Sequence, residues 1–233
     1  MAMIDDLTAL VSRVVEDNHD ALGEAAEAIA ASGRGGGLLY AAGAGHSLAA
    51  VMETFFRAGG LAFVRPLWDH SILPLAGALA STAAERTAGL GTDVARRARI
   101  TEADTVLIFS NSGINPYPVE IAQHARENGA RVISMTSVAS SASAPKRAAH
   151  RLFEISDIVL DTEVPPGDVT WPPQSPVTAP ASTIITASLW AAILRQIDTI
   201  APDAPRWKSA NTTGTDDFNA ALVERFAPRI PEL

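Results

Sequence analysis

The sequence predicts an α/β protein with a parallel β-sheet. Short apolar runs of strand length alternate with segments of helix length, which is the pattern of βαβ units. One construction also occurs twice, near residues 45 and 112: an apolar strand, a loop of small and hydroxylated residues, and then a helix. Loops that leave the carboxyl ends of parallel strands meet at one edge of the sheet, so the two loops predict one shared site.

The first third of the chain supplies the first elements. Apolar residues between 4 and 29 recur mostly every three or four positions, with acidic residues on the other face, and predict one long amphipathic helix. The glycine-rich segment 33–37 ends it. A buried strand over 38–42, the first loop, a helix over 48–58 and a strand over 61–68 are expected next.

The rest of the chain continues the alternation. Four helices are predicted, over 75–91, 92–99, 116–128 and 182–200. The first ends at Gly89 or Gly91, and the second is short and basic. The predicted strands are 105–109, which is the strongest, 131–137 and 158–161. Between the last strand and the last helix, residues 162–180 contain six prolines, which exclude a regular helix. A loop of this length is usually functional, and we expect it to lie over the ligand-binding edge.

Domain organisation follows from length and composition. The 233 residues, 47% of them hydrophobic, suffice for one large α/β domain, so a single domain over residues 1–233 is expected. The tail 201–233 is polar and punctuated by prolines. We expect it to be irregular and to pack on a partner subunit or on the body of the protein.

Charge and residue usage exclude several classes of partner. A net charge of −8 argues against nucleic acid and against anionic membrane surfaces, because both favour clustered basic residues. The N-terminal segment lacks the basic and apolar regions of a signal peptide, and no apolar run approaches membrane-spanning length, so a cytoplasmic protein is expected. There is no cysteine, and no two of the five histidines are four residues apart. Neither a metal nor a cofactor is therefore expected.

The second loop carries the clearest binding signal. Asn115 is a suitable N-cap residue, and proline is favoured at the first helical position that follows it. Ser110, Asn111 and Ser112 precede this positive end of a helix and offer donors to an anion. Thr136 and Ser137, at the end of a third strand, are expected to line the same edge. An ordinary polar turn is the alternative for a single loop of this kind.

The first loop adds Gly45, which has no side chain and lets an anion approach the backbone, and Ser47, which offers a hydroxyl donor. Two other interpretations apply to it. A dinucleotide-binding fingerprint is incomplete, because Leu48 stands where the third glycine belongs. A nucleophile elbow has the pattern G-x-S-x-G, and the segment 45–49, GHSLA, lacks the last glycine. The acid and the histidine that a catalytic triad needs also do not follow in the expected order. Two matching loops favour an anion site.

Over residues 4–200 the chain resembles the sugar isomerase (SIS) domain of phosphosugar-binding proteins. The glycine-serine loop near residue 45, the SNSG loop that opens a helix and the Thr-Ser end of strand 131–137 carry this likeness. More narrowly, the segments GAGHS, FFRAGGLAFVRP, STAAERTAGLG and SANTTGTDDFNAALVERF are similar to bacterial SIS proteins labelled phosphoheptose isomerases. The resemblance implies a five-stranded parallel sheet flanked by helices, in a flavodoxin-like three-layer sandwich. It also implies a homodimer or dimer of dimers with sites near the subunit interface. The phosphate-contacting positions that it implies are Ser47, Ser110, Asn111, Ser112 and Asn115.

Aldose–ketose isomerisation needs a general base, for which the sequence offers three candidates. In SIS isomerases and related etherases a glutamate often lies ten residues after the loop serine, but Arg57 stands there in this chain. Glu53, one turn earlier on the same helix, is the favoured base. The alternative is that Glu53 is a solvated surface carboxylate without a catalytic role. His46 is expected to shuttle a proton or to serve as a structural loop residue. Glu85 is expected to reach the site, on the resemblance, or to be an exposed helix residue.

We therefore expect a phosphosugar-binding protein that interconverts aldose and ketose forms through an enediol. One alternative is a sugar-phosphate lyase or etherase of the N-acetylmuramic acid 6-phosphate type, which would use the same base. The other is a non-catalytic phosphosugar sensor, which would need a protein partner because no DNA-binding segment accompanies the domain.

Overall fold

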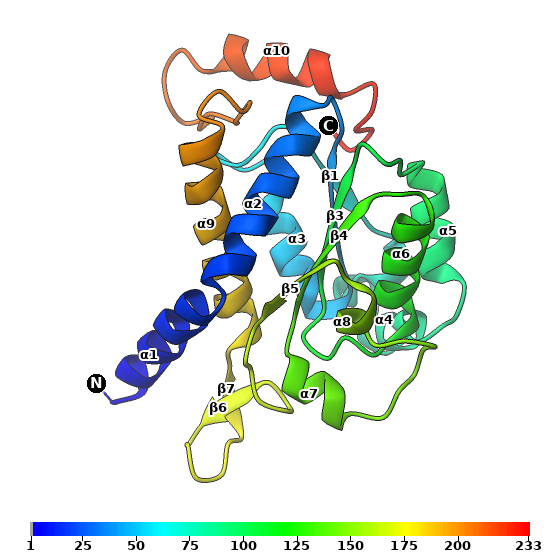
Figure 1. Cartoon of the computed structure of the whole chain (residues 1–233), viewed down its shortest axis with the longest axis vertical. Coiled ribbons are helices and arrows are strands. Elements are labelled where there is room, and N and C mark those ends of the chain that lie inside the picture. Colours follow the sequence, from blue (N-terminus) through cyan, green and yellow to red (C-terminus); the bar gives the residue numbers. More distant parts are fainter. Residues whose placement is uncertain (1) are drawn as a thin grey trace.

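Five strands form one parallel sheet in the computed structural model, which describes residues 2–233 (Figure 1). The strands are β1 (Leu39–Gly43), β2 (Val64–Leu67), β3 (Thr105–Phe109), β4 (Arg131–Thr136) and β5 (Ile158–Asp161). Their order in the sheet is β2-β1-β3-β4-β5, and all neighbours are parallel. Every residue of β1 and β3 is buried, as expected for central strands covered on both faces. The predicted fold class is confirmed.

Helices cover both faces of the sheet and complete the three layers (Figure 1). On one face lie α2 (His19–Arg34), α3 (Leu48–Thr54) and α9 (Ser182–Ile200). On the other face lie α4 (Ala78–Glu85), α5 (Leu90–Ala98), α6 (Pro116–Glu127) and the short α8 (Leu152–Ile155). The short α7 (Val138–Ser143) follows β4, and the chain also includes α1 (Ala2–Asp17) and α10 (Asp216–Phe226). No helix within residues 2–233 combines the length and apolar character needed to cross a membrane.

The single N-terminal helix expected over 4–29 is wrong, because the structure has two helices with a break at Asn18. The side chain of Asn18 is buried, and its amide donates to the carbonyls of Val14 (2.7 Å) and Asp161 (2.8 Å). Its Oδ1 accepts the N–H of Asp161 at 2.8 Å. The residue thus ties the junction to the end of β5, while α1 continues away from the sheet (Figure 1).

The C-terminal tail is more ordered than its composition suggests. Residues 216–226 form α10, which corrects the expectation of an irregular tail. The backbone of Trp207 exchanges hydrogen bonds with Gly59 and Gly60 (2.8 and 2.9 Å), and the side chain of Ile230 is fully buried. The tail therefore packs on the body of the same chain. The proline-rich segment likewise contains a short antiparallel hairpin, β6 (Val169–Trp171) with β7 (Thr178–Pro180).

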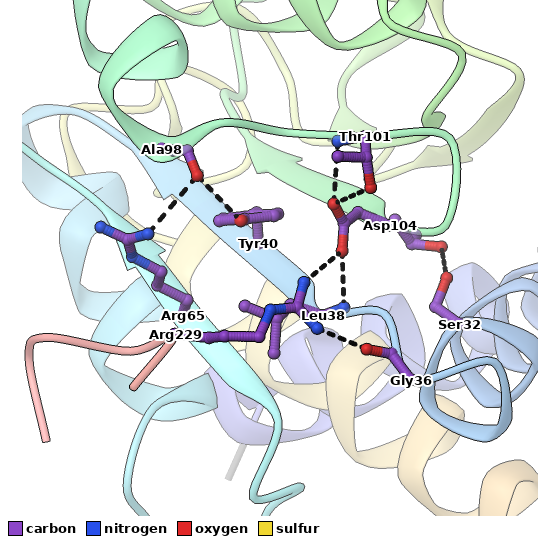
Figure 2. A network of polar contacts seen from close by, with 10 residues as sticks. Ser32, Gly36, Leu38, Tyr40, Arg65, Ala98, Thr101, Asp104 and Arg229 are labelled. Carbon is purple, nitrogen blue, oxygen red and sulfur yellow. Dashed lines mark hydrogen bonds and ion pairs between the residues drawn. The ribbon is translucent and has the colours of Figure 1, made fainter. Parts of the chain in front are cut away.

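A polar network fastens the end of the chain to the amino edge of the sheet (Figure 2). The carboxylate of Asp104 has no exposed surface and accepts from the N–H of Leu38 (2.7 Å), the N–H and hydroxyl of Thr101 (both 2.8 Å) and the guanidinium of Arg229 (3.2 Å).

Tyr40 is part of the same network. Burial, with a smaller contribution from the Asp104 carboxylate, raises the pKa of Tyr40. The Tyr40 phenol thus stays protonated and donates to the carbonyl of Ala98 at 3.1 Å.

Helices α5 and α6 pack tightly against each other at Gly91. A Cβ atom at this position would lie 2.3 Å from the carbonyl oxygen of Tyr117 and 2.9 Å from the Cβ of Glu120. The Glu120 carboxylate also accepts the N–H groups of Gly89 and Gly91, at 2.8 and 3.0 Å, so the start of α5 is held at a fixed distance from α6.

We expect Gly91→Ala to destabilise the protein by about 1–3 kcal/mol, because the added methyl group forces α5 away from α6. The matched control is Gly23→Ala within α2, where a Cβ would meet its nearest neighbour, Oε1 of Gln196, at an ordinary 3.5 Å. That change should be neutral or slightly stabilising, since alanine is the better helix residue. Thermal unfolding of both variants checks the prediction, and equal effects would contradict it.

Candidate functional site

The loops that follow β1 and β3 line one cavity of about 630 Å³ at the carboxyl edge of the sheet. This volume lies within the range of small-molecule sites, roughly 300–1,000 Å³. The first loop contributes Gly45, His46 and Ser47, and the second contributes Ser110, Asn111 and Ser112. The structure thus brings the two predicted loops together, as the parallel topology requires.

The first loop turns sharply into α3. Gly45 has a φ of +58°, a conformation that glycine adopts readily, and it begins a short 3₁₀ turn, Gly45–Ser47. A Cβ on Gly43 would lie 2.9 Å from the carbonyl oxygen of Ser47, so the strand end and the turn pack without room for a side chain. In this arrangement the His46 side chain is exposed and Ser47 is partly buried at the cavity wall.

The second loop is held from behind by the end of β4. The carbonyl of Asn111 accepts the N–H of Ser137 (2.9 Å) and the hydroxyl of Thr136 (3.3 Å). A Cβ on Gly113, whose φ is +58°, would lie only 2.7 Å from the Thr136 hydroxyl. The Ser110 hydroxyl accepts the N–H of Gly113 at 3.2 Å. The loop is thereby fixed before any ligand arrives.

Thr136 and Ser137, two of the predicted binding residues, lie behind the second loop and do not line the cavity. Thr136 is fully buried against the loop, and Ser137 is buried with its hydroxyl accepting the N–H of Ser140 at the start of α7. Neither is among the residues that line the cavity. The expectation that they face the ligand is therefore corrected: they shape the second loop from behind.

Asn115 occupies the predicted N-cap position of α6, but its side chain does not cap the helix. Its amide nitrogen donates to Oε1 of Glu85 at 2.7 Å, and its amide oxygen accepts from Nη1 of Arg147 at 3.0 Å. Glu85, at the last residue of α4, lines the cavity, and its Oε2 lies 4.0 Å from where a Cβ on Gly45 would stand. Asn115 and Arg147 are not among the lining residues, so the predicted contact of Asn115 with phosphate is corrected: its amide links the Arg147 guanidinium to Glu85 at the cavity wall.

Of the three candidate proton-transfer residues, the structure places His46 and Glu85 at the cavity but not Glu53. Glu53 pairs with Arg57 at 2.9 Å, on the exposed side of α3, and its side chain is 34% exposed. Arg57 lies three residues beyond the end of α3 at Thr54, so the chain after the helix brings the guanidinium back to Glu53. Glu53 therefore makes an ordinary surface ion pair in this chain.

The proline-rich segment covers one side of the cavity, as its length predicted, through Pro166, Gly167 and Asp168. Asp168 was not foreseen from the sequence. Its carboxylate accepts the N–H groups of Ala181 and Ser182, at 3.1 and 2.8 Å, and the Ser182 hydroxyl at 2.6 Å. It therefore caps α9 from a distant part of the sequence and anchors the segment beside the cavity. The sequence shows Asp168 only as an aspartate in a loop, and this does not predict that it caps α9.

The charge at the cavity is unusual for an anion site. Glu85 and Asp168 are its acidic lining residues, and no lysine or arginine is among the lining residues within 2–233. Asp168 already occupies the start of α9. Helix α6 begins with Pro116 and Pro118 around Tyr117, and proline has no N–H to donate; none of these residues lines the cavity. The two serine loops are therefore left for an anion. No cluster of three metal-binding side chains was found among the described residues.

A larger hollow of about 980 Å³ lies at the opposite edge of the sheet, against α2. Several of its polar side chains already have structural partners: Asp104 binds Leu38 and Thr101, Arg126 donates to a main-chain carbonyl, and Asp157 accepts a main-chain N–H. Neither loop reaches it. The smaller cavity is therefore the better candidate for a specific site.

Comparisons with known proteins bear on the family and the fold of the chain. A family model described as SIS domain matches residues 3–137. A UPF0309 protein of Brucella canis is 35% identical over 234 residues, which cover 98% of this chain and 96% of that protein. Phosphoheptose isomerase GmhA of Neisseria gonorrhoeae has a TM-score of 0.57 at 19% identity, covering 85% of this chain and 96% of that one. A phosphoheptose isomerase of Francisella tularensis has a TM-score of 0.54 at 17% identity, covering 85% and 95%.

Proposed function

The chain belongs to the SIS domain family, and on this basis we propose that it binds a sugar phosphate between its two loops and interconverts the aldose and ketose forms of that sugar. The observation that carries the proposal is the composition of one cavity wall. Serine residues from both loops, Glu85 and His46 all line the same space.

The serine loops are the proposed phosphate end. Hydroxyl groups of Ser47, Ser110 and Ser112 can donate to phosphate oxygens, and the loop that carries Ser110 and Ser112 leads into the 12-residue helix α6. The dipole at the start of such a helix favours an anion, but Pro116 and Pro118 in the first turn of α6 have no N–H, so the donors must come from the loop itself. The absence of lysine and arginine from the described lining residues means that these neutral donors must supply most of the attraction.

The proposed chemistry uses Glu85 in place of Glu53 as the base, because Glu85 lines the cavity and Glu53 does not. Glu85 would remove the proton from the carbon next to the carbonyl, while His46 gives a proton to the carbonyl oxygen, which yields the enediol. The reverse steps complete the isomerisation: His46 takes the proton from the other hydroxyl, and Glu85 returns a proton to the neighbouring carbon. No cofactor is needed for this sequence of proton transfers.

The test is incubation of the protein with a panel of hexose, heptose, pentose and amino-sugar phosphates in D₂O, followed by NMR. Isomerisation predicts a new ketose or aldose together with deuterium on the carbon next to the carbonyl. A lyase would release a substituent from the sugar, which would replace isomerisation as the function. The same spectra distinguish these two results, whereas neither deuterium incorporation nor product, together with binding measured by calorimetry, would favour a sensor.

We expect Ser112→Ala to weaken sugar-phosphate binding by roughly 10- to 100-fold, since a hydrogen bond to a charged group contributes about 1.5–3 kcal/mol. The matched control is Ser188→Ala on α9, where the hydroxyl is exposed and donates to the carbonyl of Ile184. Isothermal titration calorimetry with the best member of the panel measures both. Equal affinity of Ser112→Ala and wild type would contradict the phosphate assignment.

A further inference from the structure

The amide of Asn115 can adopt only one orientation between its two neighbours. An ionised Glu85 carboxylate only accepts hydrogen bonds, and the Arg147 guanidinium only donates them. The amide must therefore turn its NH₂ group toward Glu85 (2.7 Å) and its oxygen toward Arg147 (3.0 Å). A flipped amide would set oxygen against oxygen and nitrogen against nitrogen. Because Asn115 is only 6% exposed, water cannot readily replace either partner.

This orientation also selects the oxygen atom of Glu85 that faces the cavity. The amide engages Oε1, and Oε2 lies beside Gly45 in the first loop. If the amide were free to flip, its hold on Oε1 would be lost and the carboxylate could rotate. Arg147 does not line the cavity itself, so its influence on the cavity passes through Asn115.

The local sequence leaves Arg147 available for this contact. It lies in the link between α7 and α8 with two other basic residues, Lys146 and Arg151, which both contact Glu154, at 3.1 and 3.6 Å. Arg151 also donates to the carbonyls of Ser141, Ala142 and Ala144. Those two residues hold the link in place, while Arg147 reaches across to the start of α6.

We infer that Arg147 is a positioning residue, which acts through the Asn115 amide to direct the Glu85 carboxylate into the cavity. The inference rests on the proposed function for its catalytic meaning, because Glu85 is the proposed base. The part of the inference that concerns the orientation of Asn115 and Glu85 can be tested without any enzyme activity. Lysine can replace the charge of Arg147 but not the planar, multi-donor guanidinium.

The test uses Arg147→Gln and Arg147→Lys, with Lys146→Gln as the neighbouring control. In ¹⁵N-labelled protein, the side-chain amide signals of Asn115 are assigned by their loss in Asn115→Ala. We expect these signals to shift in Arg147→Gln and in Glu85→Gln but not in Lys146→Gln. With the sugar phosphate that the panel identifies, kcat of Arg147→Gln should fall by up to about 100-fold with KM little changed, because misplacing a reacting group costs rate more than binding. Arg147→Lys should recover part of the loss.

The outcomes separate this inference from the proposed function. Unshifted Asn115 amide signals in Arg147→Gln would overturn the inference, and so would shifted signals with an unchanged kcat. If the wild-type protein turns over no sugar phosphate, the proposed function fails, and the amide signals alone decide whether Arg147 orients Asn115 and Glu85.

Discussion

Glu85→Gln is expected to lower kcat for sugar-phosphate isomerisation by about 10²- to 10⁴-fold, the usual contribution of a general base. Glutamine has nearly the same shape, and its amide oxygen can still accept from Asn115, whose nitrogen lies 2.7 Å from the present carboxylate. The wall of the cavity should therefore keep its form, and affinity for the sugar phosphate should change only a few-fold. Deuterium incorporation from D₂O measures proton abstraction, and calorimetry measures binding.

Glu53→Gln is the matched control for this prediction. Glu53 is also a helix glutamate, but it pairs with Arg57 on a partly exposed surface and does not line the cavity. Its replacement should leave kcat within about 2-fold, since an exposed ion pair contributes little. The reverse pattern, with loss of turnover in Glu53→Gln and full turnover in Glu85→Gln, would return the base to Glu53.

Asp104→Ala is expected to produce the largest loss of stability, about 2–6 kcal/mol. The change leaves the buried N–H of Leu38 without its acceptor, at about 1–3 kcal/mol, and removes the hydrogen bonds of the partly buried Thr101 N–H and hydroxyl to a charged group, worth about 1.5–3 kcal/mol. It also removes the partner of Arg229, which links the C-terminal segment to the sheet (Figure 2). For a chain of this size the melting temperature should fall by on the order of 10 °C.

Arg229→Gln is the control for Asp104→Ala. The Arg229 side chain is 47% exposed, and without it the buried Asp104 carboxylate still accepts from Leu38 and Thr101, so the cost should be well below that of Asp104→Ala. Both changes lie at the edge of the sheet opposite the cavity and should not alter sugar-phosphate affinity in the folded protein. Equal stability losses in the two variants would show that the main-chain acceptor role of Asp104 has been overestimated.

The parts of the fold that local sequence determines were predictable. Strand 105–109 and helix 182–200 match the structure residue for residue, because each has a continuous apolar pattern between clear breaks. The break at Asn18 was missed, since the helical pattern runs through it and only contacts with Asp161 reveal it. Helix α10 was missed because prolines and polar residues around it hide a short amphipathic stretch.

Part of the candidate site could also be predicted from the sequence, and part could not. Convergence of the two loops followed from the parallel topology, which the order of elements predicts. The Glu85–Asn115–Arg147 chain did not follow, because its members come from three segments separated by about 30 residues each. Spacing along one helix favoured Glu53, whereas the position of α4 relative to the first loop brings Glu85 to the cavity. Contacts between distant segments are not encoded in any local pattern.

The most direct test of the central claim is thermal stabilisation of the wild-type protein and Ser112→Ala by the sugar-phosphate panel, with inorganic phosphate and the free sugars as controls. A ligand at a hundred times its dissociation constant adds about 2.7 kcal/mol, or roughly 5–10 °C here. The account predicts a selective shift with one sugar phosphate that is much reduced in Ser112→Ala. No shift with any sugar phosphate, or an equal shift in both proteins, would contradict it.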